Sequence, residues 1–197
     1  MNQFKKSELK LIKKKALELS KGKSETEARI SIFNYVRDIP YYVQPNQNPL
    51  DAMKQNRGNC GQKARLLNLL LKEIGIHTKF ISMEYRLDRL PMPSHILKTL
   101  QLKTDYHLAN MIRRGNRWIL LDATADPGLA KGKFHVNEWD GKSDTKPFVK
   151  PITTSEDKEY RKRLNAWLKQ TETIDRNKLN VSLDKWNKYF EKLRKKL

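Results

Sequence analysis

The sequence predicts an α+β fold, because helical and strand patterns occupy separate stretches of the chain. Helical patterns come first and end in a helix led by the only cysteine. Antiparallel strands follow, and further helices close the chain. With 197 residues, 38% of them hydrophobic, the chain is long enough for one domain with a core of its own.

Four helices are predicted in the first 75 residues. Apolar residues at helical spacing among lysines indicate a basic amphipathic helix over residues 4–20. Ser24 and Glu27 form a capping-box pattern that opens a second helix, which runs to about Asp38. The pair Asn48-Pro49 can start a short helix that stops at Gly58. Residues 60–74 have a wide apolar face and end at Gly75, as expected of a buried helix.

Strands are predicted next. Residues 76–85 alternate as in a strand, and residues 106–113 and 117–122 read as a hairpin turning at Arg114-Gly115-Asn116. The chain then reads as irregular from Pro127 to about Thr153. Two further helices are expected, capped by Ser155 and Ser182. Their inward residues are predicted to be Tyr160, Leu164, Trp167 and Leu168 in the first, and Leu183, Trp186, Phe190 and Leu193 in the second.

Positive charge is concentrated at the two ends of the chain. The formal net charge is +19; residues 1–25 hold 8 Lys+Arg and 3 acids, and residues 142–197 hold 16 and 8. We therefore expect a basic helix over 1–23, a core over 24–141 and a basic helical extension over 142–197 that packs on or beside the core. Such flanks can attract nucleic acid or an acidic protein, or they can simply keep helix faces solvated.

The composition excludes several classes of protein. One cysteine allows neither an intramolecular disulfide framework nor a multi-cysteine zinc site, and the four histidines show no metal-ligand spacing. We therefore expect no metal site. No apolar run reaches the roughly 18 residues that a membrane span needs, and the start lacks the pattern of a signal peptide. A cytoplasmic protein without a transmembrane segment is the expectation.

Cys60 lies where a loop becomes a helix, in the stretch Arg57-Gly58-Asn59-Cys60-Gly61. Unpaired backbone N–H groups and the positive end of the helix dipole favour the thiolate there, and the thiolate is the nucleophilic form. Most lone cysteines, however, are inert buried residues. A reactive cysteine also needs a base within hydrogen-bond reach and a group that orients the base.

His107 and Asp122 can supply these two groups. If the hairpin turns near Gly115, residues whose numbers sum to 229 or 230 face each other, and His107 and Asp122 satisfy this rule. Asp126 is an alternative carboxylate that fits the rule less well. An oxyanion donor is also expected. The backbone N–H of Cys60 is one candidate, and the side chain of Gln55, or else Gln44 or Gln47, is the other.

The two blocks of residues together resemble the transglutaminase-like superfamily of papain-related cysteine enzymes. The first block is Gly58-Asn59-Cys60 with Ala64, Leu67, Leu70 and Gly75-Ile76; the second is His107, Gly115, Trp118 and Asp122, and Ile39-Pro40-Tyr41-Tyr42 is similar too. The resemblance covers about residues 26–127. Two positions depart from the family pattern: Ala109 stands where a tryptophan is frequent, and Ala123 where a proline is frequent.

The resemblance implies a papain-like core, with the cysteine helix packed on an antiparallel sheet. It also implies Cys60 as nucleophile, His107 as general base and acid, and Asp122 as the orienting carboxylate. The implied chemistry is acyl transfer through a thioester on a peptide or carboxamide bond of a protein or peptide substrate, and this chemistry is expected to need no cofactor. Hydrolysis by a protease or amidase is slightly favoured over amine cross-linking, and removal of glycans from asparagine is a third possibility. The alternative class is a basic binding module on the same scaffold, which engages nucleic acid or an acidic protein.

Overall fold

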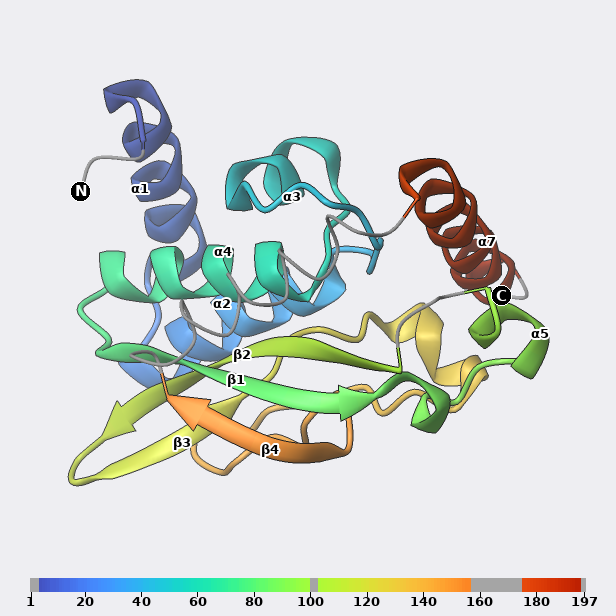
Figure 1. Ribbon diagram of the computed structural model, residues 1–197. Helices are drawn as coiled ribbons and strands as arrows, with labels where there is room; N and C mark the ends of the chain where they lie inside the picture. The colour runs from blue at the N-terminus through green and yellow to red at the C-terminus, as the bar shows by residue number, and fades with distance from the viewer. Residues whose placement is uncertain (1–3, 100–102, 157–174, 196–197) are drawn as a thin grey trace.

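The computed structural model describes residues 4–99, 103–156 and 175–195 and shows an α+β fold (Figure 1). Helices lie on one face of an antiparallel sheet of four strands in the order β3-β2-β1-β4. The strands are β1 (Thr78–Arg86), β2 (Thr104–Arg114), β3 (Arg117–Leu121) and β4 (Pro151–Glu156). The α-helices are α1 (Lys6–Ser20), α2 (Glu25–Asp38), α3 (Pro49–Gln55), α4 (Cys60–Glu73), α5 (Ser94–Leu97) and α7 (Arg176–Arg194), with short 3₁₀ helices η1 (Leu87–Arg89) and η2 (Pro127–Gly132).

The predicted helices of the first 75 residues are present. The capping box that opens α2 is formed: the Ser24 side chain accepts a hydrogen bond from the Glu27 backbone, and the Glu27 carboxylate accepts one from Ser24 N–H. α3 is shorter than predicted, because the chain leaves the helical region at Asn56, whose φ is 48°. α4 ends just before Gly75, which adopts a φ of 79° that suits glycine.

The second half differs more from expectation. β4 was predicted to be irregular; it is an edge strand with most of its residues exposed, so its sequence shows no apolar alternation. Ser155 therefore lies in a strand and caps no helix. Ser182 is also not a cap, because α7 begins six residues earlier, with Asp175 accepting the N-terminal hydrogen bonds. The predicted inward residues Tyr160, Leu164, Trp167 and Leu168 lie outside the described residues.

Two apolar clusters stabilise the fold. The first lies between α1, α2, α4 and the sheet, and includes Ile12 and Ala16 of α1. The second lies where α7 approaches the sheet and η2, and includes Trp186 and Phe190, as predicted. α1 thus shares a core with the central part of the chain, and the boundaries near residues 23 and 141 stay predictions.

α7 is fastened to the segment that leads towards the cysteine. The Asn187 side chain bonds both backbone groups of Val43, accepting from its N–H at 2.8 Å and donating to its carbonyl at 2.9 Å. Arg194 donates to the Asp126 carboxylate at 2.7 and 3.1 Å and to the Tyr41 carbonyl at 2.8 Å. The C-terminal helix therefore helps to hold residues 41–43 in place.

Candidate active site

Cys60 is the first residue of α4, and hydrogen bonds fix the chain on both sides of it. Asn59 caps the helix: its side chain accepts from Gln62 N–H at 2.9 Å, and the Gln62 side chain accepts from Asn59 N–H at 3.1 Å. The Asn59 amide also donates to the carbonyls of Gln44 and Asn46. Such a capping box fixes the direction in which the chain enters a helix. The thiol is partly exposed, and the N-terminal end of the helix favours its negative form.

Gly58, two residues before the cysteine, allows a close approach of two segments. Its N–H donates to the Pro40 carbonyl and its own carbonyl accepts from Tyr42 N–H, both at 3.0 Å. A Cβ at this position would lie 2.8 Å from the Cβ of Ala52, closer than real side chains come. The glycine is therefore required for the 40–42 segment, α3 and the cysteine loop to meet.

His107 and Asp122 are brought together, as predicted, although by a different register. The residue numbers of paired positions in β2 and β3 sum to 231, so the predicted rule was off by one or two residues. Continuing that register places Ala109 opposite Asp122, which follows the end of β3. His107 is thus the diagonal neighbour on the same face, and its Nε2 lies 2.7 Å from Asp122 Oδ2.

His107 is influenced by both of its expected partners. Its Nε2 contacts Asp122 at 2.7 Å, and the Cys60 thiol is among the groups that shift the pKa of the imidazole. Burial lowers the pKa of His107, but the charge and hydrogen bond of Asp122, with the bond and charge of Cys60, outweigh it and raise this pKa from 6.5 to about 10. The imidazole is therefore protonated at neutral pH.

Both carboxylate oxygens and the backbone N–H of Asp122 form hydrogen bonds. Its Oδ2 accepts from Phe148 N–H at 2.7 Å as well as from His107, and its Oδ1 accepts from Thr124 N–H at 3.1 Å. Its backbone N–H donates to Thr145 Oγ1 at 2.8 Å. Burial raises the pKa of Asp122, but the charge of His107 and the hydrogen bonds lower it by more. The net shift of this pKa is therefore downward. The carboxylate is thus ionised and its orientation is set.

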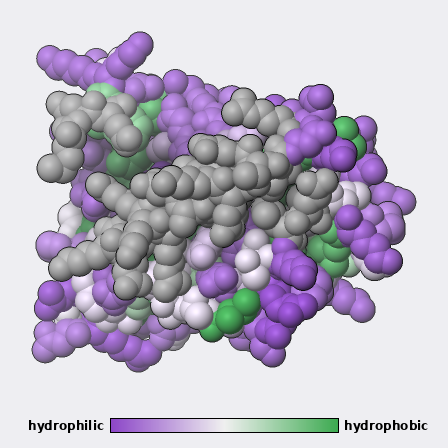
Figure 2. All heavy atoms as spheres, in the orientation of Figure 1, coloured by the Kyte–Doolittle hydropathy of each residue, from purple (hydrophilic) through white to green (hydrophobic). Residues whose placement is uncertain are grey.

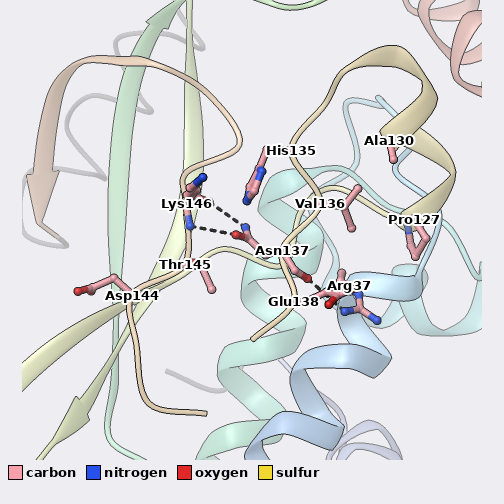
Figure 3. Close-up of a pocket in the computed structure, with 10 residues that line it drawn as sticks. All are labelled: Arg37, Pro127, Ala130, His135, Val136, Asn137, Glu138, Asp144, Thr145 and Lys146. Atoms are coloured by element: carbon pink, nitrogen blue, oxygen red, sulfur yellow. Dashed lines mark hydrogen bonds between the residues drawn. The ribbon is translucent and has the colours of Figure 1, made fainter. Parts of the chain in front are cut away.

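The loop after β3 supplies this support, and the sequence patterns missed it. The Asn137 side chain donates to the backbone carbonyl of Asp122 at 2.9 Å. It also donates to the Lys146 carbonyl at 2.8 Å and accepts from Lys146 N–H (Figure 3). The Phe148 ring lies 5.6 Å from the His107 ring and packs against Tyr41 and Phe134. Residues 127–150 have no periodicity that would have drawn attention to them.

A cavity of about 540 Å³ is lined mostly by residues of this loop after β3 (Figure 3). Neither Cys60, His107 nor Asp122 lines it, so this cavity is distinct from the candidate catalytic group. Its lining residues are Arg37, Pro127, Ala130, His135, Val136, Asn137, Glu138, Asp144, Thr145 and Lys146.

A further carboxyl group lies on the same face of β2 as His107. Asp105 Oδ2 accepts a hydrogen bond from the Tyr85 hydroxyl at 3.4 Å, and burial raises the pKa of Asp105 to about 6. Burial also raises the pKa of Tyr41 well above 10, and the charges of Cys60 and Asp105 add to that shift. Asp105 is therefore an acidic group two residues from His107 on β2 that the sequence did not single out.

The other candidates lie elsewhere. Gln55 is an exposed residue at the end of α3. Gln44, in contrast, lies over the first turn of α4: its side chain donates to Gln62 Oε1 at 2.8 Å and its carbonyl accepts from Asn59. Asp126, the alternative carboxylate, bonds Arg194 and Tyr41 N–H. Trp139 is buried against Phe33.

Within the described ranges, no group of three or more His, Cys, Asp or Glu side chains could hold a metal ion. Over the same ranges, no helix is both long enough and apolar enough to cross a membrane. One face of the molecule is largely hydrophilic where its atoms are coloured (Figure 2). On α1, the exposed basic residues include Lys6, Lys10, Lys13 and Lys14, with Leu9 and Leu17 exposed beside them.

Comparison with known proteins identifies a family for the chain. The model of the transglutaminase-like superfamily matches residues 13–123, more than half of the chain. A comparison with the curated proteins found no match. Among solved structures, a protein from Cytophaga hutchinsonii named as a putative cysteine protease is similar at 16% identity and a TM-score of 0.46, over 75% of this chain and 42% of its own. A protein from Parabacteroides distasonis named as a putative protease is similar at 16% identity and a TM-score of 0.41, over 60% of this chain and 25% of its own. The chain spans less than half the length of either protein.

Proposed function

Since the chain belongs to the transglutaminase-like superfamily, we propose that it is an enzyme that transfers acyl groups through a thioester on Cys60, with His107 and Asp122 as its partners. The observation that carries this proposal is the 2.7 Å contact between Asp122 and His107, together with the influence of the Cys60 thiol, at the start of α4, on the pKa of that imidazole. A nucleophile, a base and a group that orients the base are the three parts that such chemistry needs.

The geometry supports the following reaction. The Cys60 thiolate attacks the carbonyl carbon of a peptide or carboxamide, forming a C–S bond. The C–N bond then breaks, and the departing nitrogen takes the proton from Nδ1 of the His107 imidazolium. His107 is now neutral and removes a proton from water or from an amine, whose O or N attacks the thioester carbon. The C–S bond breaks, and the thiolate and imidazolium are restored.

The developing oxyanion needs two donors. The backbone N–H of Cys60, in the first turn of α4, is one, because such groups have no partner within their helix. For the second we favour Gln44 over the predicted Gln55, because the Gln44 side chain already lies beside residues 59 and 62 of the cysteine helix. Gln55 is exposed.

Water is the favoured acceptor, which makes the enzyme a protease or amidase acting on a protein or peptide. Neither the sequence nor the described residues contain a calcium-ligand pattern of the kind that regulates some cross-linking members of the family. Cross-linking to an amine is the alternative outcome of the same thioester, and removal of a glycan from asparagine is a third.

Labelling of the thiol tests the triad directly. Iodoacetamide should label Cys60 well below the free-thiol pKa of about 8.5, and this labelling should collapse in His107→Ala. His77→Ala is the control, because it changes a histidine outside the site. Ammonia release from glutamine peptides, with and without a primary amine, then separates hydrolysis from cross-linking. Ordinary thiol ionisation in both the parent and His107→Ala would contradict the proposal.

The exposed lysines of α1 favour a second role, in which the basic helix engages nucleic acid or an acidic protein. Binding of a polyanion such as heparin should weaken steeply with salt. Replacing Lys10, Lys13 and Lys14 by glutamate should abolish this binding while leaving thiol labelling unchanged. Equal binding by the parent and the triple variant would exclude α1 as the interface.

A further inference from the structure

Lys63 is buried one turn after Cys60 on α4, with 1% of its surface exposed. Its ammonium donates to three backbone carbonyls: Arg37 at 3.0 Å, Ile39 at 2.7 Å and Thr124 at 2.7 Å. A protonated lysine has three N–H donors and no acceptor, so each donor has one partner.

These carbonyls belong to two segments that frame the candidate active site. Arg37 and Ile39 are at the end of α2, where the chain turns into the 40–42 segment that bonds Gly58. Thr124 follows Asp122 by two residues, and its N–H donates to the Asp122 carboxylate. One ammonium group thus links the helix that carries the nucleophile to the loop that carries the orienting carboxylate.

An apolar side chain would avoid the cost of burying a charge but could not bond these carbonyls. Burial lowers the pKa of Lys63 to about 7. Four charged groups on the surrounding elements also act on it: Asp126 and Asp122 of the loop after β3 raise the pKa, Arg194 of α7 lowers it, and Asp38 of α2 raises it. The ammonium form therefore depends on the three carbonyl groups around it, and it loses its proton within the physiological pH range.

We propose that Lys63 is a positioning residue, whose ammonium fixes α4 against the Asp122 loop and thereby sets the contact between Cys60 and His107. Its meaning for catalysis rests on the proposed function. When Lys63 loses its proton, the neutral amine keeps two donors for three carbonyls, and one of the three links is released. The reactivity of Cys60 then falls near pH 7, although His107 keeps its proton to about pH 10.

Two variants separate this role from ordinary packing. Lys63→Met keeps an unbranched apolar side chain, one atom shorter, and removes all three donors, whereas Lys72→Met is the matched control on the exposed end of the same helix. The rate of iodoacetamide labelling at Cys60 and the imidazole titration of His107, followed by NMR, are measured against pH in the parent and both variants.

The labelling rate of the parent should fall near pH 7. Lys63→Met should label at least about tenfold more slowly below that pH, since small displacements of reacting groups have effects of this size, and should show no fall near pH 7. Lys72→Met should match the parent. Labelling of Lys63→Met within twofold of the parent, with the same pH profile, would overturn the proposal.

The two proposals can fail separately. If Cys60 of the parent labels as an ordinary thiol, the proposed function fails, and the His107 titration still decides the role of Lys63: a displaced titration in Lys63→Met supports positioning, and an unchanged one refutes it. If Lys63→Met does not fold, the parent alone decides, because a labelling rate that stays level from pH 7 to about 10 contradicts the coupling.

Discussion

His107 Nε2 and Asp122 Oδ2 are 2.7 Å apart although the two residues do not face each other across the β2–β3 hairpin. The contact is diagonal, and it exists because Asp122 lies just beyond the strand, where Phe148 and Thr124 direct its carboxylate. The loop, as much as the hairpin, therefore determines the orientation of the histidine.

Replacing Asp122 by asparagine should lower the pKa of His107 from about 10 towards its ordinary 6.5, because burial of the imidazole would then be less opposed. By analogy with other triads, activity should fall by roughly 10⁴-fold. NMR titration of the imidazole and the rate of substrate turnover measure the two effects. Asp144→Asn is the control, since Asp144 is an exposed carboxylate in the same loop; an unchanged His107 titration in Asp122→Asn would contradict the ion pair.

The pH dependence of stability should have opposite slopes in two variants. The pKa of His107 is raised from 6.5 to about 10, so its stabilising contribution is complete below pH 6.5 and is lost as the pH rises to about 10. The pKa of Lys63 is lowered from 10.5 to about 7, so the unfolded chain binds the extra proton between these values and stability rises with pH. In the parent the two effects oppose each other.

Lys63→Met should therefore lose stability from pH 7 to 9, and His107→Gln should gain it, each by up to about 1.4 kcal/mol per pH unit. Urea unfolding at intervals across this range gives the free energy of unfolding. Slopes of the same sign in the two variants would show that the pKa values of His107 and Lys63 are not shifted in opposite directions.

Arg194→Met should destabilise the protein by about 3–5 kcal/mol, because it leaves the buried carboxylate of Asp126 without its cation. It also removes the bond to the Tyr41 carbonyl, so labelling of Cys60 should slow. Arg117→Met removes an exposed ion pair with Asp144 and should cost no more than about 1 kcal/mol. Equal losses in chemical denaturation would mean that α7 is not anchored through Arg194.

Gln44→Ala should lower kcat by about 10²- to 10³-fold, as expected for loss of an oxyanion donor, and leave thiol labelling unchanged. Gln55→Ala should have no effect on kcat, because its side chain is exposed at the end of α3. The reverse result would restore Gln55, the donor predicted from the sequence. Steady-state kinetics on the same glutamine peptide distinguishes the two residues.

Local patterns predicted the part of the fold whose signals lie within a few residues. Ser24 and Glu27 cap α2, Gly75 ends the cysteine helix, and Gly115 turns the hairpin. Each depends on neighbouring backbone geometry, which a sequence displays directly. The same patterns were misleading at Ser155 and Ser182, because a serine resembles a helix cap whether or not the chain around it is helical.

The partners of the candidate site were harder to predict. Asn137 and Phe148 bond Asp122 from positions 15 and 26 residues away along the chain, and Arg194 reaches Asp126 across 68. β4 pairs with β1 across about 70 residues of intervening chain. Contacts at such separations depend on how the chain closes its loops, and no periodicity records them.

The sequence by itself determined the element types of the first half, the place of Cys60 at a helix start and the pairing of His107 with Asp122, because caps, turns and side-chain alternation are local. Only the tertiary structure decided the diagonal register of His107 and Asp122, the hydrogen bonds that orient Asp122, and the burial of Lys63 between α2 and the Asp122 loop. A lysine on a helix usually faces water. Lys63 is buried because its ammonium bonds three carbonyl groups, and these lie together only after distant segments of the chain have packed.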